Sequence, residues 1–118
     1  LRDYGRLGLF ALNEGRLPDG TEVLPEGWMS QSATPSAAYP GYGYLWWLGD
    51  FNTNGTSGRV ISAQGNGAQY AFAVPSLDLA VAFTGSRYAF KDAEGKMDVA
   101  QVVPPIVACT RSEPKPPR

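Results

Sequence analysis

The residues with the clearest potential for chemistry are two glycines among amide side chains, at Gln64-Gly65-Asn66-Gly67, with Gln69 close behind. They stand where one apolar run ends and the next begins. Glycine lets a ligand approach the backbone closely, and N–H groups at a strand end can stabilise negative charge on an oxygen. Two interpretations follow: a hairpin turn that needs positive φ, which local evidence favours, or a strand end whose N–H groups point at a ligand oxygen.

Other catalytic patterns are weak. The glycine pair does not form a nucleotide-phosphate loop, because Tyr70 occupies the place of the third glycine and a strand-like run follows. An S-x-x-K pattern, in which lysine assists deprotonation of serine, occurs at residues 112–115, but Pro114 and Pro116 disfavour the helix it requires. No G-x-S-x-G is present, and no tyrosine is followed two residues later by asparagine.

Acidic side chains do not form an obvious acid/base pair. Those considered for such work fall in predicted turns or loops, where solvated charge is the default: Asp78, Asp92, Glu94 and Asp98. Asn54-Gly55-Thr56 fits a glycosylation acceptor pattern, which matters only in a secretory eukaryotic setting.

Composition narrows the class of protein. At 118 residues the chain is about one domain, and ten Lys and Arg against eleven Asp and Glu give a net charge of −1, which argues against nucleic-acid binding. Histidine is absent and Cys109 is the sole cysteine, so we expect no disulfide framework, no His/Cys metal site, no cofactor and no internal Ser-His-Asp triad. No apolar run approaches the roughly 20 residues of a membrane span. The chain starts without Met or a signal-peptide pattern, so we expect the natural start upstream. The balanced charge leads us to expect a small molecule or another protein as partner.

Predicted helices lie on both sides, in sequence, of the segment that carries these residues. The spacing of apolar residues predicts an amphipathic helix over Leu1–Asn13, ended by Gly15. A turn at residues 18–20 precedes a predicted short helix, with Pro25 at its first position and Trp28 and Met29 following. Residues 30–40 are expected to form a loop. A further helix is expected over residues 98–109, kinked or restarted at Pro104-Pro105, and residues 112–118 are expected to be a disordered tail after a domain spanning residues 1–111.

Four extended segments are predicted between these helices, at residues 42–48, 59–63, 69–74 and 79–84. The last two alternate large and alanine side chains, and the short turn at residues 75–78 makes them antiparallel. Neither face is polar, so we expect a sheet covered on both sides, with a helix close to the alanine side. Adjacent Trp46 and Trp47 should point to opposite faces, and we expect both to be buried, with part of the covering layers missing from this sequence.

Three segments in order resemble the C-terminal part of the serine β-lactamase and penicillin-binding-protein-like hydrolases, in the branch of class C β-lactamases, esterases and 6-aminohexanoate-oligomer hydrolases. The segments are "LRDYGRLGLFALNEGRLPDGTEVLPEGWM", "GYGYLWWL" and "SAQGNGAQYAFAVPSLDLAVAFTG". The resemblance implies an α+β fold, an antiparallel sheet flanked by helices in a β-lactamase/transpeptidase-like arrangement. It also implies a serine and lysine from an S-x-x-K helix and a tyrosine from a Y-x-N loop, all upstream of this chain.

The family's K-T-G or H-x-G element matches Ala63-Gln64-Gly65 by position. The resemblance then places the second oxyanion-hole donor on the backbone N–H of Asn66. Ala63 departs from the family, because the best-known members carry Lys or His there to attract a substrate carboxylate. An ester or neutral amide therefore becomes the favoured substrate over a β-lactam, and Gln64 and Gln69 either contact it or are solvated strand residues.

The function expected from the resemblance is acyl transfer or hydrolysis of an ester, amide or β-lactam. The isolated chain is expected to be catalytically inactive until the missing N-terminal half of the domain is added. Periplasmic or secreted localisation follows from the resemblance alone, and a cytoplasmic site stays open. Two alternatives remain: a non-catalytic module whose Tyr42, Tyr44, Trp46 and Trp47 bind sugars or peptides, and a degenerate remnant that needs a partner.

Overall fold

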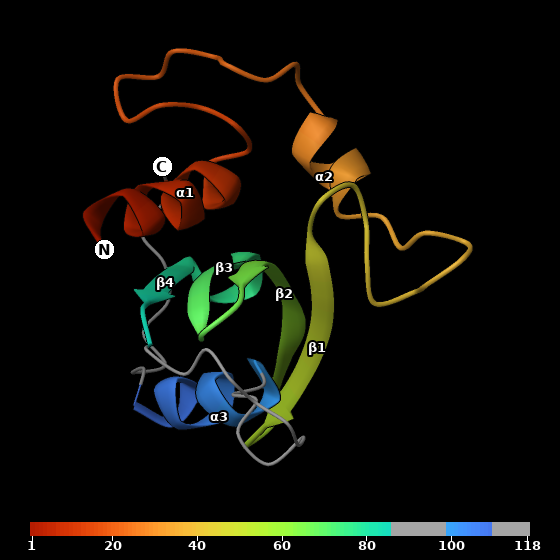
Figure 1. Ribbon diagram of the computed structural model, residues 1–118, viewed down its shortest axis with the longest axis vertical. Coiled ribbons are helices and arrows are strands. Elements are labelled where there is room, and N and C mark those ends of the chain that lie inside the picture. The colour runs from red at the N-terminus through yellow and green to blue at the C-terminus, as the bar shows by residue number, and fades with distance from the viewer. Residues whose placement is uncertain (86–98, 110–118) are drawn as a thin grey trace.

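The computed structural model describes residues 1–85 and 99–109, and its centre is one antiparallel sheet with helices on both faces (Figure 1). The four strands pair in chain order: β1 (Trp47–Thr53), β2 (Thr56–Gly65), β3 (Gln69–Val74) and β4 (Leu79–Phe83). The helices are α1 (Arg2–Leu12), α2 (Trp28–Ser32) and α3 (Val99–Cys109), and the 3-10 turn η1 (Pro75–Leu77) joins β3 to β4. The expected α+β class, an antiparallel sheet flanked by helices, is confirmed at this level.

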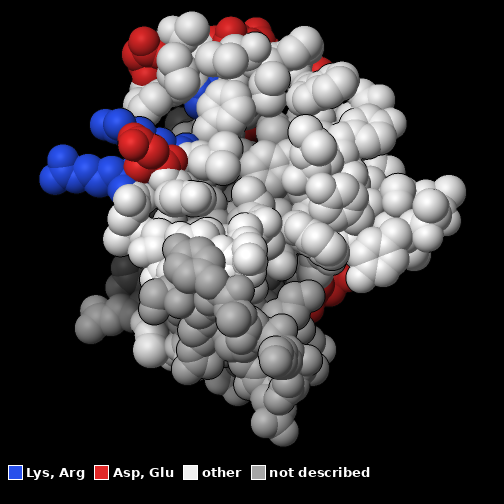
Figure 2. Space-filling view, viewed as in Figure 1, with Lys and Arg blue, Asp and Glu red and all other residues white. Residues whose placement is uncertain are grey.

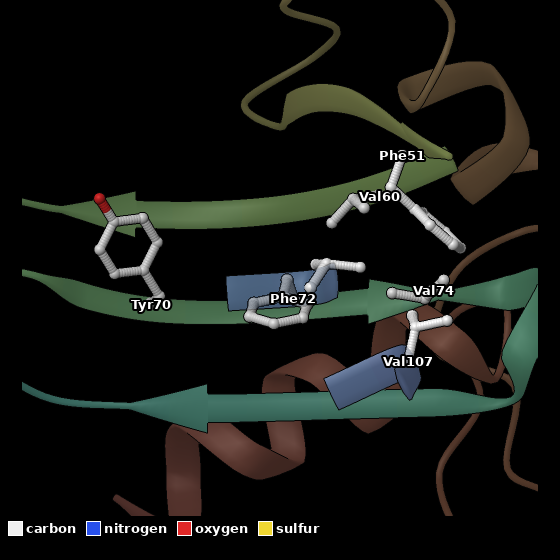
Figure 3. Close-up of a cluster of buried hydrophobic side chains, with 7 residues drawn as sticks. Phe51, Val60, Tyr70, Phe72, Val74 and Val107 are labelled. Atoms are coloured by element: carbon white, nitrogen blue, oxygen red, sulfur yellow. The ribbon is translucent and has the colours of Figure 1, made fainter. Parts of the chain in front are cut away.

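The large side chains of the strands form the core on the face that α3 covers. Alternation along β3 turns Tyr70, Phe72 and Val74 to this face, where they are buried. They form one cluster with Phe51, Val60, Val103 and Val107, and Figure 3 shows the strand residues beside Val107 of α3. Phe72 and Val103 are fully buried, so α3 is held by apolar contacts to the sheet rather than by charge.

The opposite face of β3 and β4 is lined by alanine and covered by α1, as the sequence predicts. Ala71 and Ala73 are completely buried there. Gly8 of α1 lies so close to the sheet that a Cβ atom at its position would be 3.2 Å from the Phe72 carbonyl oxygen and 3.4 Å from Ala80 Cβ. Small residues on both sides therefore set the short spacing between α1 and the sheet.

The predicted end of α1 at Gly15 is confirmed. Glu14 and Gly15 both adopt left-handed backbone conformations, with φ of 55° and 80°, and the Gly15 N–H donates to the Phe10 carbonyl. A side chain at Gly15 would begin 2.6 Å from Leu24 Cβ, so glycine is required for space as well as for conformation.

The strand predicted at residues 42–48 is wrong for most of its length. Residues 42–46 form a loop in which Leu45 has a φ of 66°, and β1 begins only at Trp47. Gly49, Asp50 and Asn52 have low strand propensity, which hides β1 in the sequence. The missed signal is Asn54-Gly55, whose φ values of 52° and 78° make the two-residue turn of a β1–β2 hairpin.

Several other boundaries differ from the predictions. Residues 59–63 are extended, but β2 runs further at both ends, and β4 stops at Phe83 rather than Thr84. Pro25 precedes α2 by three residues, where its carbonyl accepts from the Trp28 N–H, and α2 takes in residues 30–32 of the expected loop.

Helix α3 passes through Pro104-Pro105 without interruption, instead of restarting there. The two prolines lack the N–H groups of two helical hydrogen bonds. Burial of Val103 and Val107 against the sheet offsets that loss. Asp98 and the predicted tail at residues 112–118, with its S-x-x-K match, lie outside the described residues.

Trp46 and Trp47 do point in opposite directions. Trp46 packs against the cluster of Ala11, Met29 and Ala73 on the α1 side. Trp47 has its indole against Tyr42, with ring centroids 4.9 Å apart, and remains 37% exposed, contrary to the expected burial of both. This arrangement rules out a single flat platform that includes both tryptophans.

Candidate active site

The glycine-rich stretch forms the tip of the β2–β3 hairpin. Gly65 pairs with Gln69, which leaves Asn66, Gly67 and Ala68 as a three-residue loop. Gly67 and Ala68 are left-handed, with φ of 82° and 66°, whereas Gly65 is not among the positive-φ residues. The need for positive φ therefore explains Gly67 but not Gly65.

Close pairing of the strands accounts for Gly65 instead. A Cβ atom at this position would lie 3.2 Å from Gln69 Cβ, which is tighter than most such contacts. Gly65 is also exposed, so the backbone at the end of β2 is open on its solvent side. A small molecule can approach the peptide group between residues 65 and 66 without meeting a side chain at Gly65.

Asn66 is exposed and lies just past the end of β2. Among the described loops and turns, no backbone acceptor receives its N–H. Asn66 therefore lies just beyond the last β2–β3 pair, Gly65–Gln69, at the strand end where an oxyanion donor is expected.

Gln69 fixes the loop from the other strand. Its Nε2 donates to the Gly85 carbonyl at 2.6 Å and to the Gly67 carbonyl at 3.4 Å. Both amide hydrogens are thus used within the chain, which leaves only Oε1 for a ligand. This geometry gives Gln69 a role in positioning the loop.

Gln64 takes part in a second set of linked hydrogen bonds. Its Nε2 donates to Ser62 Oγ at 2.9 Å, and Ser62 Oγ donates to the Trp47 carbonyl at 3.4 Å. Ser62 is buried and has no basic side chain among its described hydrogen-bond partners, so it links β1 to β2 rather than acting as a nucleophile. This contact was not predictable from the sequence, because it joins residues fifteen positions apart.

The proposed site residues divide between the two faces of β2. Ala63 is half-buried and pairs with Ala71 on the alanine side, the face that Gly65 shares, whereas Gln64 pairs with Tyr70 on the α3 side. The hairpin therefore brings together Ala63, Gly65 and the loop residues but directs Gln64 away from them. If one ligand contacts this set, it does so mainly through the backbone.

Among the residues that the structure describes, charge is sparse around the hairpin. No Asp, Glu, Lys or Arg occurs between Val60 and Leu77. Arg59 is engaged by Asp50, with Nε 3.1 Å from Oδ1, on exposed side chains. Within residues 1–85 and 99–109, no group of three or more His, Cys, Asp or Glu is placed to hold a metal ion. The polarity of the site comes from peptide groups and amides.

A hollow of about 300 Å³ lies elsewhere, beyond the C-terminal end of α1. It is lined by Leu12, Asn13, Glu14, Arg16, Leu17, Pro18 and Gly20, and none of the hairpin residues contributes. Its charged groups already have partners, since Glu14 accepts from Ser30 Oγ and Arg16 pairs with Glu22, both at 3.4 Å.

Comparison with known proteins finds no matching family model and no matching curated protein. Of the helices in the described part of the chain, none has the length and apolar character to cross a membrane.

Proposed function

We propose that this chain is the C-terminal portion of a serine hydrolase of the β-lactamase and penicillin-binding-protein-like family, with a β-lactamase/transpeptidase-like fold. Such an enzyme transfers or hydrolyses the acyl group of an ester, amide or β-lactam through an acyl-enzyme. The observation that carries the proposal is the position of Asn66, an exposed residue just past the strand end and beside Gly65. The three resembling segments in their order support it.

In the proposed reaction, a serine from the preceding half of the domain attacks the substrate carbonyl while its proton passes to a base from that half. The carbonyl oxygen becomes anionic, and the Asn66 N–H donates to it. Collapse of this intermediate breaks the bond to the alcohol or amine, which leaves with the proton. Water then attacks the acyl-enzyme by the same steps and releases the acid and the free serine.

The residues around Asn66 favour a neutral substrate. Ala63 offers no charge, and the neighbouring strand residues have none to add. A substrate carboxylate would lose its water here without gaining a cationic partner from the described residues of the hairpin. We therefore place esters and neutral amides ahead of β-lactams with a free carboxylate.

The missing half of the domain also has a surface to contact. Four apolar side chains in and just before α1 remain exposed: Leu1, Tyr4, Leu7 and Leu9. Tyr4 and Leu7 lie one helical turn apart, beside the face that packs on the alanines, and can join an apolar interface.

A fluorophosphonate serine probe and a chromogenic ester test the proposal. The isolated chain should neither be labelled nor turn over the ester, and both activities should appear when the upstream half is added. Mass spectrometry should locate the label on the added half. Labelling of the isolated chain, or an inactive complete protein that binds neither reagent, would contradict the proposal.

A further inference from the structure

Residues 27–49, here named the aromatic segment, have an unusual composition. They hold all three tryptophans of the chain and three of its six tyrosines, but no phenylalanine. They also contain no Asp, Glu, Lys or Arg. In the structure they comprise α2, the loop that follows it and the start of β1 (Figure 1).

Much of this apolar material faces solvent. The exposed side chains are Tyr39 (57%), Tyr44 (55%), Trp28 (43%), Trp47 (37%) and Leu45 (84%). Figure 2 shows an uncharged surface on the side of the molecule where this loop projects. With aromatic side chains of about 150–250 Å² each, the exposed part amounts to roughly 500 Å², within the range of about 300–600 Å² for the largest apolar patch of a monomer, which is often functional.

Leu45 is the clearest sign that this surface is used. Its φ of 66° is a left-handed conformation that is costly for a branched aliphatic residue, and its side chain is the most exposed of the large apolar ones described. The residue gains little from its own fold in return. A contact outside the chain would explain why leucine stands at a position suited to glycine.

Several backbone N–H groups of the loop are hydrogen-bonded within the aromatic segment. N–H groups that lie along it donate to carbonyls within the segment: those of Ser36, Tyr42, Gly43, Tyr44 and Leu48. Ser36 Oγ also accepts from the Tyr39 N–H and donates to its carbonyl. These five N–H groups need no water, which lowers the cost of bringing the loop to an apolar surface.

Aromatic rings of the segment contact one another in two groups, one around Trp47 and one that includes Tyr44. Tyr39 and Tyr42 meet Trp47 nearly edge-on, with interplanar angles of 83° and 76°. Trp28 and Tyr44 lie 6.4 Å apart between centroids. The exposed rings are therefore held in place before any partner binds.

We propose that the aromatic segment docks onto a neutral or zwitterionic lipid surface, with Leu45 inserted and the Trp and Tyr rings at headgroup level. Trp and Tyr favour this level because one end of each ring system is polar, and Phe, which lacks that end, is absent from the segment. The absence of charge fits lipid without net charge. This is attachment at an interface and not a membrane span.

One feature disfavours a protein partner. Protein interfaces draw on arginine as well as Trp and Tyr for their strongest contacts, and the segment has no arginine.

Flotation of the 118-residue chain with phosphatidylcholine vesicles tests the proposal, using Leu45→Asn and Leu17→Asn as a matched pair. Asn tolerates the left-handed backbone at position 45. Leu17 is an exposed leucine outside the segment, and its variant controls for lost surface hydrophobicity. Thermal unfolding establishes that both variants fold.

The wild-type chain should float, and its tryptophan emission should shift to shorter wavelength. Leu45→Asn should lower the partition coefficient about tenfold or more, because a nearly fully exposed leucine loses its burial in lipid. Leu17→Asn should bind like wild type, and high salt should leave binding unchanged. A wild-type chain that stays with the lipid-free protein would overturn the proposal. So would equal binding of both variants, dependence on anionic lipid, or a lipid-free dimer that Leu45→Asn dissociates.

Discussion

Gln69 ties the tip of the β2–β3 hairpin to the end of β4, because its Nε2 donates to the Gly85 carbonyl over 2.6 Å. The same nitrogen reaches the Gly67 carbonyl, inside the loop that contains Asn66. One side chain therefore restrains a loop with two consecutive left-handed residues. An N–H that is to stabilise a developing charge has to be held in one orientation, and Gln69 supplies that restraint.

Replacing Gln69 with Ala should destabilise the chain by about 1 kcal/mol, since it removes these hydrogen bonds and leaves the Gly85 carbonyl to find water. Hydrogen exchange at Gly67 and Ala68 should become faster. Gln31→Ala, at an exposed position of α2, is the control and should change neither quantity. Unchanged exchange in Gln69→Ala would show that the loop holds its shape without this contact.

Two glycines of α1 should respond in opposite ways to the same substitution. Gly5→Ala should stabilise the chain by roughly 0.5–1 kcal/mol, because nothing lies within 4 Å of the added methyl and Ala favours helix. Gly8→Ala should lose that gain, and Gly8→Val should destabilise by about 1–3 kcal/mol, as the side chain pushes α1 off the sheet. Urea unfolding measures all three. Equal gains at Gly5 and Gly8 would contradict the close packing.

Leu45→Gly should stabilise the fold by roughly 0.5–1 kcal/mol. Glycine removes the left-handed strain, which exceeds the entropy that glycine adds to the unfolded chain. The measurement is the free energy of unfolding by urea. A loss of stability would mean that Leu45 makes a contact within the fold that outweighs its strain.

The pKa of Asp19 should lie below its ordinary value, because the Thr21 N–H donates to Oδ1 at 2.9 Å and favours the charged carboxylate. A depressed pKa stabilises the fold above the unfolded-state pKa, and this contribution disappears as the pH falls through the folded-state pKa. Carboxyl carbon NMR should give the low midpoint, and Thr21→Pro, which lacks the N–H, should raise it. A midpoint unaffected by that change would exclude the turn as the cause.

The sequence predicted those parts of the fold in which local pattern and tertiary packing agree. The alternation of large and small side chains over residues 69–74 predicted β3. The alanines of that alternation predicted a helix packed close to the sheet, which is α1. β1 was missed because its own residues are poor strand formers and its position depends on pairing with β2 through the Asn54-Gly55 turn. Leu45 was missed for the opposite reason, since leucine in an apolar run does not reveal a left-handed backbone.

The sequence also predicted only part of the candidate site. The glycine spacing placed Asn66 beyond a strand end, where the structure has it. The role of Gln69 was not predictable, because its partner Gly85 lies sixteen residues away and the contact exists only once β3 and β4 pair. Whether Asn66 serves catalysis stays a prediction of the resemblance and the loop geometry.

The most direct test compares Asn66→Ala with Asn66→Pro in the proposed complete protein, in which this chain follows a half that carries the nucleophile. Alanine keeps the backbone N–H and proline removes it, so ester hydrolysis should survive the first change and fall about 100- to 1,000-fold in kcat with the second. Thermal unfolding of both variants establishes that the fold is intact. Full activity in a folded Asn66→Pro variant would contradict the account.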